Sequence, residues 1–354
     1  QHIKNDYQIV YTPHIASEEI YKISGHLEKY SDLMYSPMDI EGKPFRVKPM
    51  NCPGHIMIYK SRLYSYRELP LRMAELGTVY RYEKSGVLHG LMRVRGFTID
   101  DAHIFCMQEQ LEDEMLRVFN FTVDFLKVFG FNEFEIYLAT KPDVSVGTDE
   151  DWEKATTSLK NAIEKTGYNY KIDEGGGAFY GPKIDLKIKD VLGRPWQCAT
   201  IQFDFNLPKR FDVTYRSAEG RDVLAVMIHR ALLGSIERFF GVLIEHYAGA
   251  FPVWLAPVQA VILPVSEKQN DYANEVVEKI LSEGIRAEMD SDNETLGYRI
   301  REATVNKIPY IVITGEKEKQ SKKVSIRTRD GKDLGVMDTL TFISNLKEDI
   351  IRHR

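Results

Sequence analysis

The sequence predicts an α+β protein, in which an antiparallel sheet with flanking helices is followed by a small α/β domain. In the first part, strand-like segments such as LGTVYRYE and RVRGFTIDDAHIF follow one another across short connections, which favours antiparallel pairing. After residue 255, strand and helix patterns alternate, which favours a small, mainly parallel sheet. The segment FPVWLAP places two prolines between these parts. We therefore expect one domain at 1–254 and a second at 255–354.

The local patterns predict the individual elements in turn. In the first domain we expect strands at 76–83, 93–105, 183–190 and 194–205, and helices at 108–128 and 234–248. In the second domain we expect strands at 258–265, 285–290, 310–315 and 323–329, the last two joined by a charged turn. Helices are expected there at 267–282, 296–305 and 339–351.

The composition is that of a folded protein without a global signal for nucleic acid. Of the 354 residues, 43% are hydrophobic and 28% charged, which is too apolar for a disordered chain. With 47 Lys and Arg against 52 Asp and Glu, the net charge is -5, so any contact with RNA must depend on local patches.

The cysteines and the apolar segments indicate a cytoplasmic protein. Cys52, Cys106 and Cys198 are an odd, widely spaced set, which argues against a disulfide framework and favours a reducing compartment. The first residues lack an apolar signal core, and charged residues and prolines interrupt the most apolar later stretch, so we expect no membrane span. The chain starts without Met, almost directly in a strand-like segment, and we expect residues upstream of Gln1.

Two charged pairs lie in the strand-like segments of the first domain. Alternation places Arg81 and Glu83 on one face of LGTVYRYE, and Arg93 and Arg95 on one face of the segment after the loop KSGVLHG. Charges that point into a sheet face usually meet a ligand or a partner charge, and the guanidinium fork suits phosphate. An exposed ion pair on an edge strand explains the first pair equally well.

Candidate metal ligands occur singly. In GFTIDDAHIFC, alternation puts Asp101 and His103 on one side, although an isolated D-x-H is more often a hydrogen-bonded structural histidine. Cys52 lies in MNCPGH, where Pro53 and Gly54 predict a turn whose backbone approaches another segment closely, although an isolated cysteine is more often a buried apolar residue. No CxxC or HExxH spacing is present, so a metal would need ligands from distant segments.

The segment AVMIHRALLGSIERFFGVLIEHYAG contains His229 and Arg238, which would lie on opposite sides of one continuous helix, since nine steps of about 100° give roughly 900°. They can share a site only if a strand ends near His229 and a helix starts near Gly234, which would place Ser235 one turn from Arg238. A surface helix with ordinary charges is the alternative.

The glycine run in DEGGGAFYGPKIDLKIKD predicts a mobile or close-contact loop, and it lacks the spacing of a P-loop. In the next strand, Thr200, Gln202 and Asp204 share a face. Gln197 has the opposite parity unless a bulge intervenes.

Together, these segments resemble the three signature motifs of class II aminoacyl-tRNA synthetases, in the order and spacing of the threonyl-tRNA synthetases, across essentially the whole chain. The segment around Pro13 and the helix after it resembles the first motif, which belongs to the dimer interface in this family. YRYE, its loop and RVRGF resemble the second motif, and GSIERF resembles the third. The resemblance therefore implies a homodimer.

The resemblance also assigns roles in ATP binding. It implies that Arg81 binds the α-phosphate and the amino-acid carboxylate, that Glu83 and Arg93 hold the nucleotide, and that Arg238 stabilises the γ-phosphate side. ATP would bind with Mg²⁺. Further active-site positions of the family match Lys183, Gln197 and Ser235, and the catalytic positions would be Arg81, Lys183 and Arg238.

A zinc site follows from the resemblance as well. It implies that Cys52, His103 and His229 bind Zn²⁺ and leave a coordination position open for the amine and hydroxyl of L-threonine. Asp101 would accept the hydroxyl proton in a hydrogen bond, and the further threonine contacts match Tyr180 and Gln202. Valine offers no hydroxyl and would be rejected, whereas serine requires editing, for which this chain has no visible module.

Two parts of the resemblance are less regular. Many relatives have Gln at the position of Ile99, and an apolar side chain there cannot donate to substrate. The second domain resembles the anticodon-binding domain of several class II enzymes. In it, positions that contact anticodon bases match Asn293, Glu318 and Arg327, and Lys322, Lys323 and Arg329 are available for phosphate.

The resemblance therefore implies an ATP-dependent threonine–tRNA ligase with tRNA(Thr) as its partner. A prolyl-type enzyme shares the fold but does not need the zinc ligands. A non-catalytic tRNA-binding paralogue is the other alternative, against which Arg81, Glu83, Arg238 and the three zinc positions are all present.

Overall fold

The computed structural model describes residues 1–190 and 192–353. The chain forms two compact units, Gln1–Leu243 and Ile244–Arg354, and each is described by itself. The domain boundary that we expect between residues 254 and 255 stays a prediction. Among the described residues, no helix is both long and apolar enough to cross a membrane. All three cysteines are free and buried.

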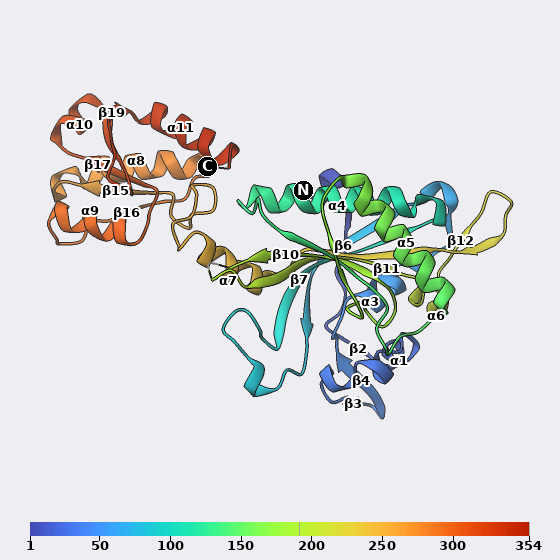
Figure 1. Cartoon of the computed structure of the whole chain (residues 1–354). Helices are drawn as coiled ribbons and strands as arrows, with labels where there is room; N and C mark the ends of the chain where they lie inside the picture. Colours follow the sequence, from blue (N-terminus) through green and yellow to red (C-terminus); the bar gives the residue numbers. More distant parts are fainter. Residues whose placement is uncertain (191, 354) are drawn as a thin grey trace. The chain divides into compact units, whose positions relative to one another are not determined.

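A large sheet organises the first unit (Figure 1). It has eight strands in the order β1-β6-β7-β14-β11-β10-β8-β9. All pairings from β6 to β8 are antiparallel, and the edge strands β1 and β9 each add in parallel. The α+β prediction is therefore confirmed. The strands are β1 (Gln8–Ile9), β6 (Leu71–Tyr80), β7 (Gly96–Cys106), β8 (Glu135–Ala139), β9 (Lys171–Asp173), β10 (Lys183–Lys189), β11 (Pro195–Asp204) and β14 (Val226–Ser235).

Two small sheets accompany the large one. They are formed by β2 (Ile15–Ser17), β4 (Lys43–Val47) and β3 (Met38–Ile40), and by β13 (Asp222–Leu224), β12 (Thr214–Arg216) and β5 (Tyr64–Ser65). The helices are α1 (Glu18–Ile23), α2 (His26–Lys29), α3 (Cys52–Tyr59), α4 (Leu111–Val128), α5 (Asp149–Thr166), α6 (Leu207–Phe211) and α7 (Ile236–His246). Short 3₁₀ turns are η1 (Ile3–Asn5), η2 (Ser31–Leu33), η3 (Tyr66–Glu68), η4 (Ser85–Val87) and η5 (Gln108–Gln110).

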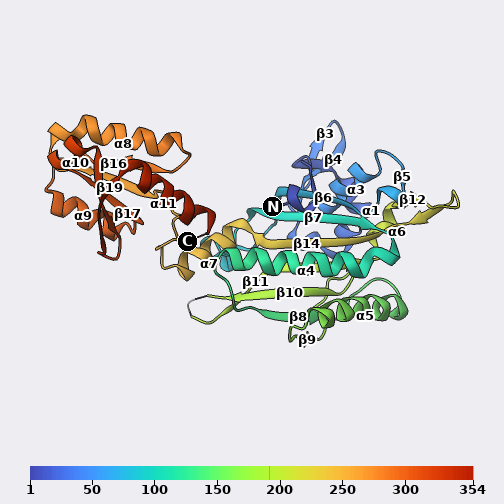
Figure 2. The ribbon, with the colours of Figure 1, turned by 90° about the horizontal axis from the view of Figure 1, so that it is seen from above.

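Helices α4 and α5 lie along one face of the sheet (Figure 2). Helix α4 buries Leu111, Met115, Val118, Phe119 and Leu126, a spacing of three, four and seven residues that forms one apolar stripe. Each large apolar side chain buried in this way contributes about 1.5–3 kcal/mol. This layer covers one side of the sheet, so the polar side chains on its other side are available for a site.

The second unit has a five-stranded sheet with the order β16-β15-β17-β18-β19. Its strands are β15 (Ala260–Pro264), β16 (Ala287–Met289), β17 (Tyr310–Thr314), β18 (Lys323–Thr328) and β19 (Asp333–Asp338). Its helices are η6 (Glu267–Gln269), α8 (Asn270–Ser282), α9 (Leu296–Val305), α10 (Glu316–Ser321) and α11 (Thr339–Ile351). The expected helices at 296–305 and 339–351 are therefore confirmed.

The prediction of a mainly parallel sheet was wrong for the last two strands. β15 pairs in parallel with β16 and β17, whereas β18 and β19 are antiparallel to their neighbours. Only the short helix α10 joins β17 to β18, and a parallel crossover needs a dozen residues or more. The expected charged turn is this helix, whose start is capped by a hydrogen bond from the Gly315 amide to the Glu318 carboxylate.

Candidate functional site

A pocket of about 500 Å³ opens in the first unit and gathers most of the predicted site residues. It lies on the side of β14 that His229 faces, whereas the guanidinium of the next residue, Arg230, lies over the ring of Phe121 in α4. The predicted residues that line it are Cys52, Arg81, Glu83, Arg93, Asp101, His103, Tyr180, Gln197, Gln202, His229, Ser235 and Arg238. Ile99 lines it too.

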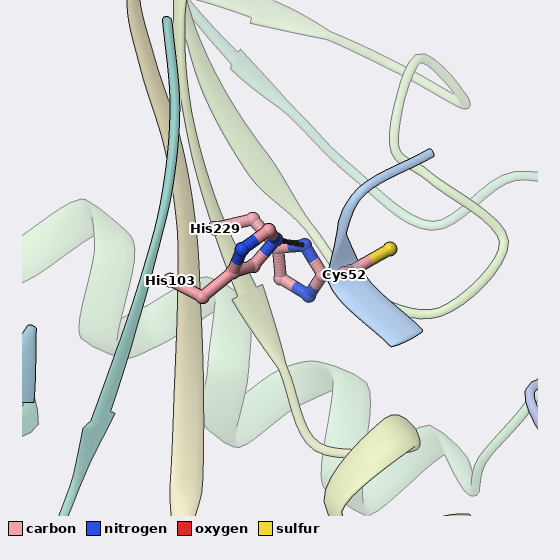
Figure 3. A group of neighbouring side chains, drawn as sticks. All are labelled: Cys52, His103 and His229. Carbon is pink, nitrogen blue, oxygen red and sulfur yellow. Dashed lines mark hydrogen bonds between the residues drawn. The ribbon is translucent and has the colours of Figure 1, made fainter. Parts of the chain in front are cut away.

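Three potential metal ligands meet in this pocket. The ligand atoms of Cys52, His103 and His229 lie within 4.8 Å of one another, and all three side chains are buried. Cys52 begins α3, while the histidines are register partners on the neighbouring strands β7 and β14. Figure 3 shows the two imidazoles approaching each other, with His103 Nε2 3.0 Å from His229 Nδ1. The fold therefore gathers residues that are far apart in the sequence.

The local sequence explains how Cys52 reaches the strands. The predicted turn in MNCPGH is the first turn of α3, where Pro53 is tolerated because its missing N–H needs no intrahelical partner. The predicted close approach is present, since a Cβ added at Gly54 would lie 2.7 Å from Thr12 Cγ2. Glycine thus allows the start of α3 to pack against the segment before β2.

The electrostatics of the group suit a cation. Burial raises the pKa of the Cys52 thiol well above its usual value, and the carboxylates of Asp101 and Asp204 add to this. A nearby positive charge is therefore needed to hold the thiolate. Burial also lowers the pKa of His103 well below its usual value, as do His229 and His55, which favours the neutral imidazole that binds metals. One thiolate and two imidazoles fit Zn²⁺ with an open position.

Polar side chains surround this group on the side of the pocket. Asp101 Oδ1 is 3.8 Å from His103 Nε2, and its Oδ2 accepts a hydrogen bond of 3.0 Å from Asn51 Nδ2. The Tyr180 hydroxyl donates to Gln202 Oε1 at 2.6 Å, and the Tyr180 ring stacks on His229 with 5.2 Å between centroids. A small polar ligand at the metal group would therefore meet a carboxylate and a fixed amide.

Arginines line the other part of the pocket. β6 ends at Tyr80, so Arg81 and Glu83 lie just beyond the strand that we expected to contain them, although both still face the pocket. The Arg81 guanidinium lies 5.0 Å from the centre of the Phe97 ring. Arg93 Nε is 3.2 Å from Glu83 Oε2. This part offers guanidinium groups beside an aromatic face, which suits a nucleotide.

The change from strand to helix before Arg238 is present, but it comes later than expected. β14 continues to Ser235, but its pairing with β7 is irregular after Ala231. The irregularity occurs because the amides of residues 232–234 donate hydrogen bonds to the Asp100 carboxylate. Gly234 adopts φ 72°, and α7 starts at Ile236. The Arg238 amide donates to Ser235 Oγ at 3.3 Å. Burial lowers the pKa of Arg238, and the charges of Arg93 and Arg81 add to this.

A bulge resolves the position of Gln197. The register between β10 and β11 shifts so that Ala199 faces Leu186 and Gln197 faces Lys187. Gln197 therefore joins the face of Thr200, whose Oγ1 lies 2.7 Å from its Nε2. Lys183 is not part of the pocket lining, but its Nζ donates to Asp185, which also accepts from Gln197.

The glycine-rich loop makes close contacts, as predicted. A Cβ at Gly181 would lie 1.9 Å from the carbonyl oxygen of Phe203, and one at Gly177 would lie 2.5 Å from that of Thr140. Only glycine permits these approaches, which place the loop that carries Tyr180 against β11 and against the residue after β8.

Known proteins resemble this chain in sequence and in fold. A model of the tRNA synthetase class II core domain (G, H, P, S and T) matches residues 35–247, and a model of the anticodon binding domain matches residues 259–349. The RNA binding domain of threonyl-tRNA synthetase from Cryptosporidium parvum superposes with a TM-score of 0.94 at 41% identity, covering 98% of this chain and 87% of that one. The chain belongs to the threonyl-tRNA synthetase family.

Other relatives agree with this membership. Threonine–tRNA ligase from Acidithiobacillus ferrooxidans is 56% identical over 336 residues, which are 95% of this chain and 52% of that protein. The enzyme of that name from Aquifex aeolicus is 55% identical over 350 residues, 99% of this chain and 55% of that protein. The chain thus spans about half the length of the curated relatives it matches. Prolyl-tRNA synthetase from Cryptosporidium parvum, at 18% identity and a TM-score of 0.70, shares the fold.

In the second unit of this synthetase-family chain, the predicted anticodon contacts are not all at one place. Asn293 follows β16 and Glu318 lies in α10 after β17, so both come after the carboxyl ends of parallel strands. Arg327 faces Ile311 in the register of β17 and β18, toward the other end of β17, and its Nη2 is 3.9 Å from Asp333 Oδ2. These assignments stay predictions.

Sequence reasoning missed the residues that contact the two histidines of the Cys–His–His group in this synthetase-family chain. His229 Nε2 is 2.7 Å from Asp204 Oδ2, and His103 Nδ1 is 2.7 Å from His55 Nδ1. The sequence pattern places Asp204 only on a strand face. His55 had a signal, since it follows Cys52 by three residues, which is about one helical turn. That signal requires α3 to be known as a helix.

Proposed function

We propose that this chain is the catalytic and anticodon-binding part of a threonine–tRNA ligase, which activates L-threonine with ATP and transfers it to tRNA(Thr). The observation that supports this best is that a Cys–His–His group and a set of arginines line the same pocket. The first fits a small amino acid with a hydroxyl group, and the second fits a triphosphate. Such an arrangement brings two substrates together in one place.

In the first step, the carboxylate of threonine attacks the α-phosphorus of ATP, which binds with Mg²⁺, and pyrophosphate leaves. Arg81 would neutralise charge on the α-phosphate, with its guanidinium steadied over the Phe97 ring. Glu83 and Arg93 would hold the nucleotide, and Arg238 would bind the γ-phosphate side. Gln197 and Ser235 would complete this part of the site, and Lys183 lies outside the pocket lining, paired with Asp185. Positioning and electrostatics carry the reaction, so no side-chain nucleophile is required.

Threonine selection depends on the other part of the pocket. Cys52, His103 and His229 would hold Zn²⁺, which when bound supplies an open coordination position for the amine and hydroxyl of the substrate. Asp101 would accept the hydroxyl proton, and its orientation is fixed by Asn51. Tyr180 and Gln202 would contact the substrate as a hydrogen-bonded pair. Valine would offer no hydroxyl to Asp101, and the loss of this hydrogen bond to a charged acceptor costs about 1–3 kcal/mol or more.

The second step passes threonine from the adenylate to the terminal ribose of tRNA(Thr). We propose that the second unit contacts the anticodon through Asn293, Glu318 and Arg327, with Lys322, Lys323 and Arg329 near phosphates. We also propose a cytoplasmic homodimer. Exposed apolar side chains on the N-terminal segment, including Ile9, Tyr11 and Ile15, support the dimer.

Amino-acid-dependent exchange of pyrophosphate into ATP tests this function. The purified chain should exchange with threonine, more weakly with serine, and not with valine or proline. Equal exchange with proline would favour a prolyl-type enzyme. If no amino acid supports exchange while tRNA still binds, the chain is a non-catalytic tRNA-binding protein, and the proposal is wrong.

A further inference from the structure

We propose that His55 is a positioning residue for the metal ligand His103, and that Glu75 fixes the tautomer of His55. This inference rests on the proposed metal site. It concerns residues that contact neither the proposed substrates nor the metal. These residues form a buried hydrogen-bonded network that has no role in the two reaction steps.

The chain of contacts is continuous and buried. His55 Nδ1 lies 2.7 Å from His103 Nδ1, and the two rings meet edge to face with 4.6 Å between centroids. On its other side, His55 Nε2 lies 3.0 Å from Glu75 Oε2. The side chain of His55 is 0% exposed and that of Glu75 is 1% exposed. Water therefore cannot replace any hydrogen-bonding partner in the network of His103, His55 and Glu75.

The order of protons follows from which atom of His103 faces the metal group. His103 Nε2 points toward His229 Nδ1, so a metal there takes the lone pair of Nε2, and the ring proton must be on Nδ1. That N–H donates to His55 Nδ1, which must then be without a proton. The proton of His55 is thus on Nε2, where it donates to Glu75. The other tautomer of His55 would turn two N–H groups toward each other and a lone pair toward a carboxylate.

Glu75 is held as the acceptor that this order requires. Its Oε1 accepts from the Thr12 amide at 3.1 Å and from Lys48 Nζ at 3.0 Å. Its Oε2 accepts from the Thr12 hydroxyl at 2.8 Å in addition to His55. Burial alone would raise the pKa of Glu75, but these hydrogen bonds outweigh it and lower the pKa to about 2. Glu75 is therefore a carboxylate, and only a donor fits opposite it.

The two histidine ligands differ in how they are oriented. His229 donates directly to the Asp204 carboxylate. For His103 the carboxylate lies one imidazole further away, with His55 between. His55 is also on α3, three residues after Cys52, so one short helix supplies a ligand and the group that orients a second ligand. Loss of His55 should therefore disturb His103 while Cys52 and His229 keep their own contacts.

The test compares metal binding by wild type and His55 variants of the whole chain. His55→Leu removes both contacts, whereas His55→Gln can accept from His103 and donate to Glu75 through one amide. We expect His55→Leu to weaken Zn²⁺ binding about 10- to 100-fold, measured by competition with a chelator. It should also change the visible absorption spectrum of the Co²⁺-substituted protein. His55→Gln should restore most of the affinity and the wild-type spectrum.

Two further variants keep the inference open to refutation. Tyr59→Phe, on the same helix but hydrogen-bonded only to the Thr214 carbonyl, is the matched control and should bind metal as wild type does. Should His55→Leu fail to fold, Glu75→Gln tests the same hydrogen-bonded network. The glutamine amide can donate to His55 Nε2 and favour the wrong tautomer of His55, so this variant should also bind Zn²⁺ more weakly. Wild-type affinity and spectrum in folded His55→Leu or Glu75→Gln would overturn the inference. If wild type itself binds no metal, the proposed metal site fails instead.

Discussion

Replacing Gly234 by Ala should weaken both the fold and ATP binding, because this glycine allows β14 to pass into α7. Its φ of 72° is costly for any L side chain, by about 1–2 kcal/mol. In addition, an added Cβ would lie 2.6 Å from the carbonyl oxygen of Cys198 on β11, and this backbone atom cannot move away alone. We therefore expect Gly234→Ala to lower the free energy of unfolding by about 2–4 kcal/mol.

The effect on function follows from the residues after the glycine. Ser235 ends β14 and Arg238 lies in the first turn of α7, and the Gly234 amide donates to Asp100 at 3.0 Å. A shift of this segment would therefore displace Arg238, the proposed γ-phosphate contact. We expect the KM for ATP in pyrophosphate exchange to rise about tenfold, which corresponds to about 1.4 kcal/mol. The KM for threonine should change less.

Gly220→Ala is the matched control. Gly220 has a similar φ of 74°, but an added Cβ would meet nothing within 4 Å. Gly220→Ala should lower the free energy of unfolding only by the conformational cost of about 1–2 kcal/mol, and it should leave the KM for ATP unchanged. Urea unfolding and exchange kinetics on both variants measure the difference. If the two variants were equally stable and had equal KM values for ATP, the proposed role of Gly234 in placing Arg238 would be refuted.

Three further predictions concern the pocket and the network beneath it. Asp101→Asn should reduce kcat/KM for threonine about 10- to 100-fold in exchange assays, because a charged acceptor is lost. The reduction should be equal for serine. An unchanged kcat/KM for threonine would exclude the proposed contact between Asp101 and the substrate hydroxyl. Ile99→Gln should change the KM for threonine, because Ile99 lines the pocket and a glutamine could donate to substrate; an unchanged KM would remove this position from the account. The lowered pKa of Glu75, about 2 against 4.5, means that its contribution to stability is present above pH 4.5 and is lost as pH falls toward 2. The free energy of unfolding of wild type should fall by about 3 kcal/mol more than that of Glu75→Gln across this pH range. If the two proteins showed the same dependence of stability on pH, the lowered pKa of Glu75 would be contradicted.

Patterns of period two and of helical spacing predicted much of this fold. The strand expected at 93–105 is present at 96–106, and the helices at 296–305 and 339–351 are present as expected. They follow from local alternation and apolar spacing, which depend only on neighbouring residues. Alternation likewise placed Asp101 and His103 on one face, and both line the pocket. Such features need no knowledge of distant contacts.

Features that depend on distant contacts were predicted less well. β14 extends to Ser235 because Asp100, on another strand, accepts its amides, and no local pattern contains that contact. The bulge that turns Gln197 toward the pocket likewise depends on pairing with β10, which no pattern within β11 contains. His55 was missed because its partner His103 is 48 residues away, and only the start of α3 at Cys52 brings them together.

The central claim is that this pocket activates threonine with the help of a metal bound by Cys52, His103 and His229. The most direct test is threonine-dependent pyrophosphate exchange by the purified chain, measured together with its zinc content, before and after removal of metal by a chelator. We predict zinc in the purified protein, loss of exchange when it is removed, and recovery when Zn²⁺ is added back. Undiminished threonine exchange by the metal-free protein would contradict the account.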